Sequence, residues 1–463
     1  MIDETVLDRT LQVALRAGGD FAEVFAEDRR ASSARLDDGK VEELTSGRER
    51  GAGIRVVRGE TTGFAHTADL SEAGLEEAAG AAAAAARGGE GTTNVVGLER
   101  RDITPPHEVR VLPESVEKAR KVETLARADD AARAEGDAIR QVSVSYADSR
   151  RRILVANSDG LLAEDDQVRT RFFVQTVAVA DTGMQTGMEA PGLTVGFELF
   201  DDVDPEEVAR TSARRALTML RARPAPTGKL PVVLKKGAGG VLFHEACGHG
   251  LEADLVAKDA SVFRGRAGEQ VASPLVTLVD DGTLAREWGA YAIDDEGAPA
   301  RHNVLIEGGV LTDYMWDLIR ARKEGREQSG NGRRETYQHL PMVRMTNTYL
   351  LAGEDDPDEI VRQTPYGIYC AQLGGGQVNT ATGDFVFGMT EAYLIENGEI
   401  TEPVRAANLI GNGPETLRHV DALGNDFGTW PGTCGKFGQG VPVSAGQPTL
   451  RVSELTIGGT AGE

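Results

Sequence analysis

The stretch that most constrains the fold is LPVVLKKGAGGVLFHEACGH, residues 230–249. Its apolar start at 230–234 predicts a buried strand, and the glycine-rich turn at 237–240 leads into a predicted helix over residues 244–255. The stretch ends in His244-Glu245-Ala246-Cys247-Gly248-His249, which places two imidazoles and a carboxylate within six residues. This combination is typical of a metal-dependent hydrolase and predicts the chemistry at a strand-to-helix junction.

The spacing of the two histidines sets a geometric condition on that helix. In the usual zinc-peptidase motif they are four residues apart, which separates the side chains by about 40° around an α-helix. Here they are five apart, or about 140°, so both rings face one ion only if the backbone departs from α geometry. A single π-helical turn would supply the extra residue, and Gly248 is the position expected to accommodate it.

Composition indicates a globular protein of several folding units. The chain has 463 residues, 40% of them apolar and 27% charged, which suits two or three packed domains. No stretch is apolar enough for a membrane span, and residues 1–16 lack the features of a secretory signal, so we expect a cytosolic protein. The three cysteines, Cys247, Cys370 and Cys434, are too few and too far apart for a disulfide framework.

The net charge disfavours one class of partner. With 50 Lys and Arg against 73 Asp and Glu, the formal charge is −23, which repels nucleic-acid phosphates. A well-solvated acidic surface is the favoured interpretation over a specific docking face.

Local patterns predict an α+β protein with three domains, at residues 1–104, 105–226 and 227–463. Helical spacing marks residues 4–17, 70–86, 115–135 and 205–223. Short strands are expected at 21–27, 53–58, 142–146, 153–156 and 170–179, with tight turns at 37–39 and 157–160. The glycine-rich residues 88–91 and Pro105-Pro106 indicate the first boundary, and the proline segment 223–226 indicates the second.

A catalytic zinc requires three protein ligands and an open position. His244 and His249 supply two, and Glu245 is placed to act as general base. Cys247 lies three residues from His244 and is soft enough to bind zinc, but a buried packing role is favoured for this residue type. Glu252 and Asp254 are either acceptors that orient a ligand imidazole or solvated helix charges, and the sequence leaves both open.

These motifs resemble those of the TldD/PmbA metallopeptidases, in particular the metal-bearing TldD subunit with its HExxxH signature. Further matching blocks run almost to the end of the chain: AIDDEG at 292–297, NVLIEGG at 303–309, GNGRRETYQHLPMVRMTNTY at 330–349, YGIYCAQLGGGQV at 366–378, EAYLIENG at 391–398 and CGKFGQGVPVSAGQPTLRV at 434–452. The resemblance implies the family's multi-domain fold: a layered N-terminal α/β domain and a β-rich C-terminal metallopeptidase domain that carries the HExxxH helix.

The resemblance also implies a function. It gives Cys434 as the third ligand of one Zn²⁺, and it implies a zinc peptidase that cleaves short or unfolded peptides together with a PmbA-like partner subunit. The alternative is a non-catalytic regulatory or peptide-binding protein in which zinc only stabilises the fold. A structural zinc of that kind would want a fourth protein ligand.

Two polar or glycine-rich segments are further candidates. Arg333, Arg334, Tyr337 and His339 follow a Gly-Asn-Gly turn, where donors would stabilise an oxyanion or hold a substrate carboxylate; the alternative is a loop whose charges pair with nearby acids. The glycines at 374–376 lack the Lys-Ser/Thr pair of a phosphate loop. They would instead let a substrate strand approach the backbone and pair with it.

Overall fold

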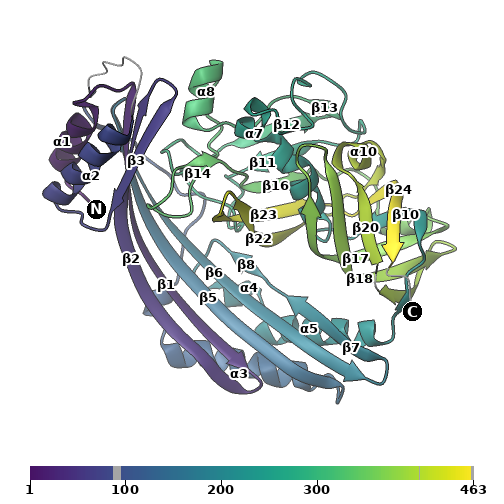
Figure 1. Cartoon of the computed structure of the whole chain (residues 1–463). Helices are drawn as coiled ribbons and strands as arrows, with labels where there is room; N and C mark the ends of the chain where they lie inside the picture. Colours follow the sequence, from purple (N-terminus) through teal and green to yellow (C-terminus); the bar gives the residue numbers. More distant parts are fainter. Residues whose placement is uncertain (87–94, 406, 460–463) are drawn as a thin grey trace.

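The computed structural model describes residues 1–86, 95–405 and 407–459, and it shows a multi-domain α+β protein (Figure 1). The expected fold class is therefore confirmed. The predicted boundary at residues 88–91 lies outside the described residues. Within these ranges, no helix is long and apolar enough to cross a membrane.

A long curved sheet forms the N-terminal half of the molecule. Its strand order is β3-β2-β1-β5-β6-β4, with β7 and β8 also paired to β6. The four central strands are antiparallel and unusually long: β1 (Phe21–Asp37), β2 (Lys40–Arg58), β5 (Ile139–Asn157) and β6 (Leu161–Ala180). The shorter strands are β3 (Thr61–Thr67), β4 (Glu99–Arg100), β7 (Gly183–Glu189) and β8 (Gly192–Leu193).

The structure corrects the expected strand lengths. The predicted strands at 142–146 and 153–156 are parts of the single strand β5, and the one at 21–27 is only the first half of β1. Charged side chains between the two apolar segments of β5 pair with neighbouring elements, as Arg150 does with Asp166 and Asp148 with Lys121. Pairing of this kind lets a strand continue through a polar stretch that has no local apolar alternation.

The predicted turns are confirmed. Asp38 and Gly39 both have positive φ, 51° and 76°, which is the geometry of the tight hairpin between β1 and β2. At the β5–β6 turn Gly160 has φ 91°, and the side-chain oxygen of Asn157 accepts from the backbone N–H of Asp159 and of Leu161.

Alternation along β1 decides what covers each face of the sheet. The apolar even-numbered residues of β1, which are Ala22, Val24, Ala26, Ala34 and Leu36, pack under four helices, α1 (Glu4–Leu15), α2 (Glu72–Ala85), α3 (Lys118–Arg133) and α5 (Pro205–Leu220). Odd-numbered residues, such as Glu23, Phe25 and Glu27, face the C-terminal part of the chain. We call these the outer and the inner face (Figure 1). Because strands from residues 1–104 and 105–226 share this sheet, those two segments form one structural layer.

The C-terminal part contains two main sheets. In the first, β17 pairs with both β10 and β18, which closes the ring β17-β10-β24-β20-β18; β19, β9 and β21 extend it. The second has the order β13-β12-β11-β16-β23-β22, and β14 pairs with β15 alone. The strands are β9 (Arg223–Pro224), β10 (Gly228–Leu234), β11 (Leu278–Asp281), β12 (His302–Glu307), β13 (Val310–Leu311), β14 (Gly332–Arg333), β15 (Met342–Val343), β16 (Asn347–Leu350), β17 (Tyr366–Val378), β18 (Asp384–Glu396), β19 (Glu399–Arg405), β20 (Ala407–Asn412), β21 (Val420–Leu423), β22 (Gly428–Lys436), β23 (Gln439–Gln447) and β24 (Leu450–Gly459).

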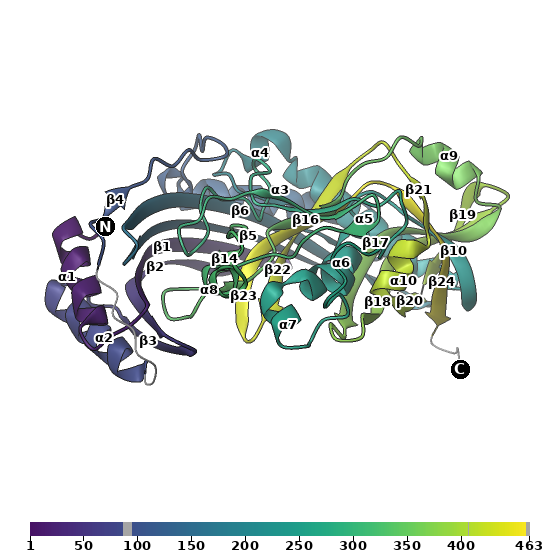
Figure 2. The ribbon, with the colours of Figure 1, turned by 90° about the horizontal axis from the view of Figure 1, so that it is seen from above.

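Short helices connect these strands, and the HEACGH segment directly follows the first of them. They are α6 (Gly240–Phe243), α7 (Ala253–Ala257), α8 (Leu318–Glu324), α9 (Pro357–Arg362) and α10 (Gly413–Arg418), while α4 (Leu199–Asp202) lies between β8 and α5. The α6 helix packs on β16 and β23, and the turn after it packs on β17 and α10 (Figure 2). The segment therefore sits between the two C-terminal sheets.

Buried ion pairs join the inner face of the long sheet to the C-terminal part. Glu23 on β1 contacts both Arg55 on β2 and Arg334, and the side chains of Glu23 and Arg334 have no exposed surface. In the same way, Arg151 on β5 reaches Glu27 at 2.7 Å and Asp295 at 2.8 Å.

Candidate metal centre

The HEACGH segment departs from α geometry as its spacing predicts. After α6, His244–Gly248 forms one π-helical turn, closed by a hydrogen bond from the backbone N–H of His249 to the carbonyl of His244. The next residues, His249–Leu251, tighten into a 3₁₀ turn. The predicted helix over 244–255 is interrupted, because Glu252 adopts an extended conformation (φ −81°, ψ 118°) before α7 begins.

Gly248 is needed for close packing. A Cβ atom built on it would lie 2.1 Å from Sδ of Met345. Its φ of −56° is ordinary, so the absence of a side chain, and not an unusual backbone angle, explains the glycine.

The fold brings His244, His249 and Cys434 together although they are far apart in sequence. One ligand atom from each residue lies within 4.8 Å of the others, and Sγ of Cys434 is 3.4 Å from Nε2 of His249. The two imidazole rings are 5.3 Å apart and nearly perpendicular, at 82°. Ligand atoms on one tetrahedral zinc lie roughly 3.3–3.8 Å apart, as follows from zinc bond lengths. The distances within the cluster are therefore close to those between the ligand atoms of a tetrahedral zinc site.

The ring nitrogens of His244 are available to hold a metal. Both of its ring nitrogens are buried and have no hydrogen-bond partner among the described residues. Buried polar atoms are almost always satisfied, and a metal held by this imidazole, the second imidazole and the thiol would satisfy it. The donor set of two nitrogens and one sulfur suits Zn²⁺ over the hard cations Mg²⁺ and Ca²⁺.

Strand β22 positions Cys434. Cys434 pairs with Val441 of β23, and the guanidinium of Arg344 donates to the carbonyl oxygen of Cys434. Burial opposes ionisation of the thiol, but the neighbouring His244 and His249 outweigh it and hold the pKa of Cys434 well below its ordinary value. The thiolate is the form that binds a metal.

A buried charge network orients His249. Its Nδ1 lies 3.0 Å from Oε2 of Glu252, and the same oxygen is 3.0 Å from Nζ of Lys436. Burial alone would raise the pKa of Glu252, yet His249 and Lys436 hold it at about 2, so the carboxylate stays charged. A carboxylate on the second ring nitrogen leaves Nε2 of His249 free for a metal.

Lys436 is the participant that sequence patterns missed. It lies two residues after Cys434, so both side chains leave β22 on the same face. Its Nζ also contacts Asp254 at 2.7 Å and the carbonyl of Val343 at 2.9 Å. Glu252 thus contacts the His249 imidazole, whereas Asp254 pairs with the lysine. The sequence did contain a signal for Lys436, because alternate residues of a strand share one face and Lys436 lies two residues from Cys434.

Glu245 differs from the three clustered residues in its exposure. The side chain is 30% exposed, while His244, His249 and Cys434 are buried. Its Oε2 lies 3.7 Å from Nε2 of His249. The carboxylate therefore stands beside the cluster on the side that solvent reaches.

Cys247 and Cys370 lie in the apolar core. Both are fully buried among apolar side chains, and burial raises the pKa of each thiol. Neither belongs to the described cluster of ligand atoms. This placement is the packing role that the sequence favours for them.

Within the polar segment at 333–339, Arg334 and Tyr337 contact other parts of the fold. The guanidinium of Arg334 has no exposed surface, which leaves nothing for a substrate to contact. Tyr337 is 5% exposed, and its ring occupies the space left by Gly51 on β2. His339 is half-buried, with Nδ1 2.9 Å from the hydroxyl of Thr336. The interpretation as a loop with paired charges fits Arg334 better than the oxyanion role.

The glycines at 374–376 lie in β17. A Cβ atom on Gly376 would be 2.1 Å from the ring of Phe387 on β18, so packing explains that glycine. The neighbouring strand β10 pairs with β17 only at Ile368–Cys370. Within the described residues, the opposite edge of the glycine stretch has no paired strand.

Family comparisons cover nearly the whole chain. Models of the PmbA/TldA metallopeptidase family match in three parts: domain 1 at residues 22–86, the central domain at 112–220 and the C-terminal domain at 227–459. A metalloprotease TldD homolog from Haemophilus influenzae is 41% identical over 95% of this chain and 93% of its own length. A zinc metalloprotease TldD homolog from Saccharolobus solfataricus is 26% identical over 97% of this chain and 99% of its own.

Solved structures confirm the fold. A putative modulator of DNA gyrase from Thermotoga maritima aligns with a TM-score of 0.82 at 24% identity, covering 98% of this chain and 100% of that one. TldE from Thermococcus kodakarensis aligns with a TM-score of 0.79 at 19% identity, with the same coverage. From the three matched domains and the 41% identical relative, we conclude that the chain belongs to the PmbA/TldA metallopeptidase family.

Proposed function

We propose that this protein is a cytosolic zinc peptidase that hydrolyses short or unfolded peptides. The ligands are His244, His249 and Cys434, and Glu245 is the general base. The observation that carries the proposal is the orphaned, buried His244 beside a second imidazole and a thiol, with one solvent-facing carboxylate next to them. The names of the relatives, metalloprotease and zinc metalloprotease, support the same reaction class.

The residues divide the chemistry among them. Zinc, when bound, supplies a Lewis acid that activates water and polarises the peptide carbonyl. Glu245 takes a proton from the attacking water and gives it to the departing amine nitrogen. Glu252 and Lys436 keep His249 in one orientation, which fixes where its Nε2 points. The open edge of β17 at the glycines 374–376 would hold an extended substrate through backbone hydrogen bonds, independent of its side chains.

A PmbA-like partner subunit belongs to the proposal. It rests on the family resemblance, and the fold likeness to TldE is consistent with it. We accordingly expect full activity from the pair and not from this chain alone. Cytosolic placement is supported by the three cysteines, which are all unbridged.

Replacing Cys434 by Ser tests the ligand set. Serine is a poor zinc ligand at neutral pH, so we expect zinc affinity to fall on the order of 100-fold or more. Zinc per chain is measured by mass spectrometry after dialysis against a buffered chelator, and circular dichroism checks that the variant is folded. A folded Cys434→Ser protein that retained full zinc would show that another residue is the third ligand.

The matched control is Cys247→Ala. Cys247 lies in the same segment as the two histidines but packs in the core, so zinc content should stay unchanged in this variant. It also decides between an open and a closed site, because a structural zinc would need a fourth protein ligand. Loss of zinc from Cys247→Ala would favour the non-catalytic alternative.

A further inference from the structure

A cavity separate from the His244–His249–Cys434 cluster lies between the inner face of the long sheet and the β22–β23 hairpin. We call it the inner cavity. Its volume is about 280 Å³. Five arginines line it, against the single carboxylate of Glu335: they are Arg29, Arg151, Arg169, Arg333 and Arg334. Glu335 is itself engaged, because its Oε2 accepts from the backbone N–H of Gly440 at 2.8 Å.

Three of these cations have no carboxylate partner within the described ranges. Arg169 donates to the carbonyls of Trp288 and Ala290 and to the amide oxygen of Gln167, all neutral groups. Arg333 likewise donates only to carbonyl oxygens, those of Met345 and Pro442. No salt bridge is present for Arg29 among the described side chains, whereas Arg151 and Arg334 have theirs.

Burial makes this arrangement unfavourable without a counter-ion. Removal from water, together with the nearby Arg333 and Arg151, lowers the pKa of Arg169 to about 9, although Asp165 and Asp295 oppose the shift. Burial also lowers the pKa of Arg333. A bound anion would stabilise such buried cations.

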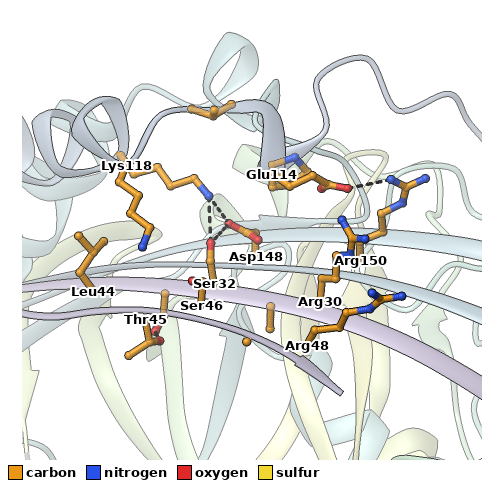
Figure 3. Close-up of a pocket in the computed structure, with 16 residues that line it drawn as sticks. Arg30, Ser32, Leu44, Thr45, Ser46, Arg48, Glu114, Lys118, Asp148 and Arg150 are labelled. Atoms are coloured by element: carbon orange, nitrogen blue, oxygen red, sulfur yellow. Dashed lines mark hydrogen bonds and ion pairs between the residues drawn. The ribbon is translucent and has the colours of Figure 1, made fainter. Parts of the chain in front are cut away.

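Basic lining residues alone do not distinguish the inner cavity from other cavities of the protein. A larger cavity of about 490 Å³ on the outer face also has basic walls (Figure 3). There, however, Lys121 bonds Asp148 at 2.7 Å, Arg150 bonds Glu114 at 2.8 Å, and Arg48 pairs with an aspartate. The other two cations of that wall, Arg30 and Lys118, form no ion pair within the described part of the chain but are exposed to solvent, whereas Arg169 and Arg333 of the inner cavity are buried.

We propose that the inner cavity is an oxyanion site for a carboxylate or a phosphate group. Bidentate guanidinium groups suit both anions, and Trp288, Val441 and Pro442 give one wall that would accept an apolar neighbour of the charge. Two sources fit this chemistry, the C-terminal carboxylate of a peptide and free phosphate. The peptide source rests on the proposed peptidase function, and the phosphate source does not.

The position of the cavity ties it to the metal centre. Thr433 lines it and directly precedes Cys434, and Pro442, which lies opposite Thr433 in the hairpin, lines it as well. Successive side chains on a strand leave opposite faces, so Thr433 faces the cavity while Cys434 faces the two histidines. A bound anion would therefore hold the long sheet against the strand that carries the third ligand.

Strand β1 provides a matched pair of variants. Arg29 lines the inner cavity, and its neighbour Arg30 lines the cavity of the outer face. Arg29→Gln and Arg30→Gln make the same change of charge one residue apart. The full chain is titrated calorimetrically with inorganic phosphate, N-acetyl-leucine and N-acetyl-leucinamide. The last two differ by one charge, and neither contains a bond between amino acids, so the result does not depend on cleavage.

We expect an anion to bind the unchanged protein and Arg30→Gln alike, and to bind Arg29→Gln roughly ten- to hundredfold more weakly, because one charge-assisted contact is lost. Preference for N-acetyl-leucine over its amide supports the site and points to a peptide C-terminus. Binding of phosphate without that preference supports the site and points to phosphate. If no anion bound, or if both variants were equally affected, the site would be refuted whatever the peptidase assays gave.

Discussion

Glu245→Gln should lower kcat for peptide cleavage by about 10²–10⁴-fold while zinc content stays unchanged. Glutamine has the shape of the glutamate side chain but cannot take a proton from water or return it to the amine. The residue is not in the buried ligand cluster, so its replacement should leave His244, His249 and Cys434 in place. The measurement is steady-state cleavage of an unstructured peptide, with zinc determined on the same sample.

The control for this variant is Glu269→Gln. Glu269 is an exposed carboxylate of the same C-terminal region, paired with Arg266, and its side chain is 57% exposed. Its replacement should leave kcat within about twofold, because exposed ion pairs contribute little. Undiminished turnover in Glu245→Gln, with zinc present, would contradict the general-base assignment.

Glu23→Gln is expected to have the largest effect on stability. This carboxylate is fully buried and faces two arginines, Arg55 and Arg334. In the variant, Arg55 would still pair with Glu296, which lies 2.8 Å away. Arg334 would have no carboxylate partner left among the described residues. Leaving a buried guanidinium uncompensated destabilises a protein by about 3–5 kcal/mol. The urea midpoint of the variant, compared with that of the unchanged protein, measures this loss.

Glu72→Gln is the matched control for stability. Glu72 pairs with Arg9 on the surface, where the two side chains are 43% and 60% exposed. Such pairs are worth about 0–1 kcal/mol, so the midpoint should hardly move. Equal midpoints for Glu23→Gln and Glu72→Gln would mean that the buried pair does not hold the long sheet to the C-terminal part.

Local chemistry made part of this structure predictable. The Asp-Asp-Gly turn at 37–39 suits a tight turn with positive φ at two residues and therefore predicts a hairpin. The five-residue spacing of His244 and His249 required one extra residue per turn, and the π-helical turn provides it. Both features are fixed by residues that are neighbours in sequence.

Local sequence patterns could not predict contacts between residues that are distant in the chain. The β5 strand continues through the basic stretch at 150–152 because carboxylates on other elements, Asp166, Glu27 and Asp295, neutralise it. The helix expected over 244–255 breaks at Glu252, whose side chain is drawn to His249 and Lys436. Cys434 could be named in advance only through the family resemblance, since nothing near it in sequence marks a metal ligand.

The central claim, a zinc-dependent peptidase, is tested most directly by incubating this protein and a PmbA-like subunit with an unstructured peptide library and identifying the products by mass spectrometry. Chelated protein and Glu245→Gln serve as blanks. We predict products that disappear on chelation, return with added Zn²⁺ and are absent with Glu245→Gln. Products that persisted in the chelated sample, or no products from a fully zinc-loaded pair, would contradict the account.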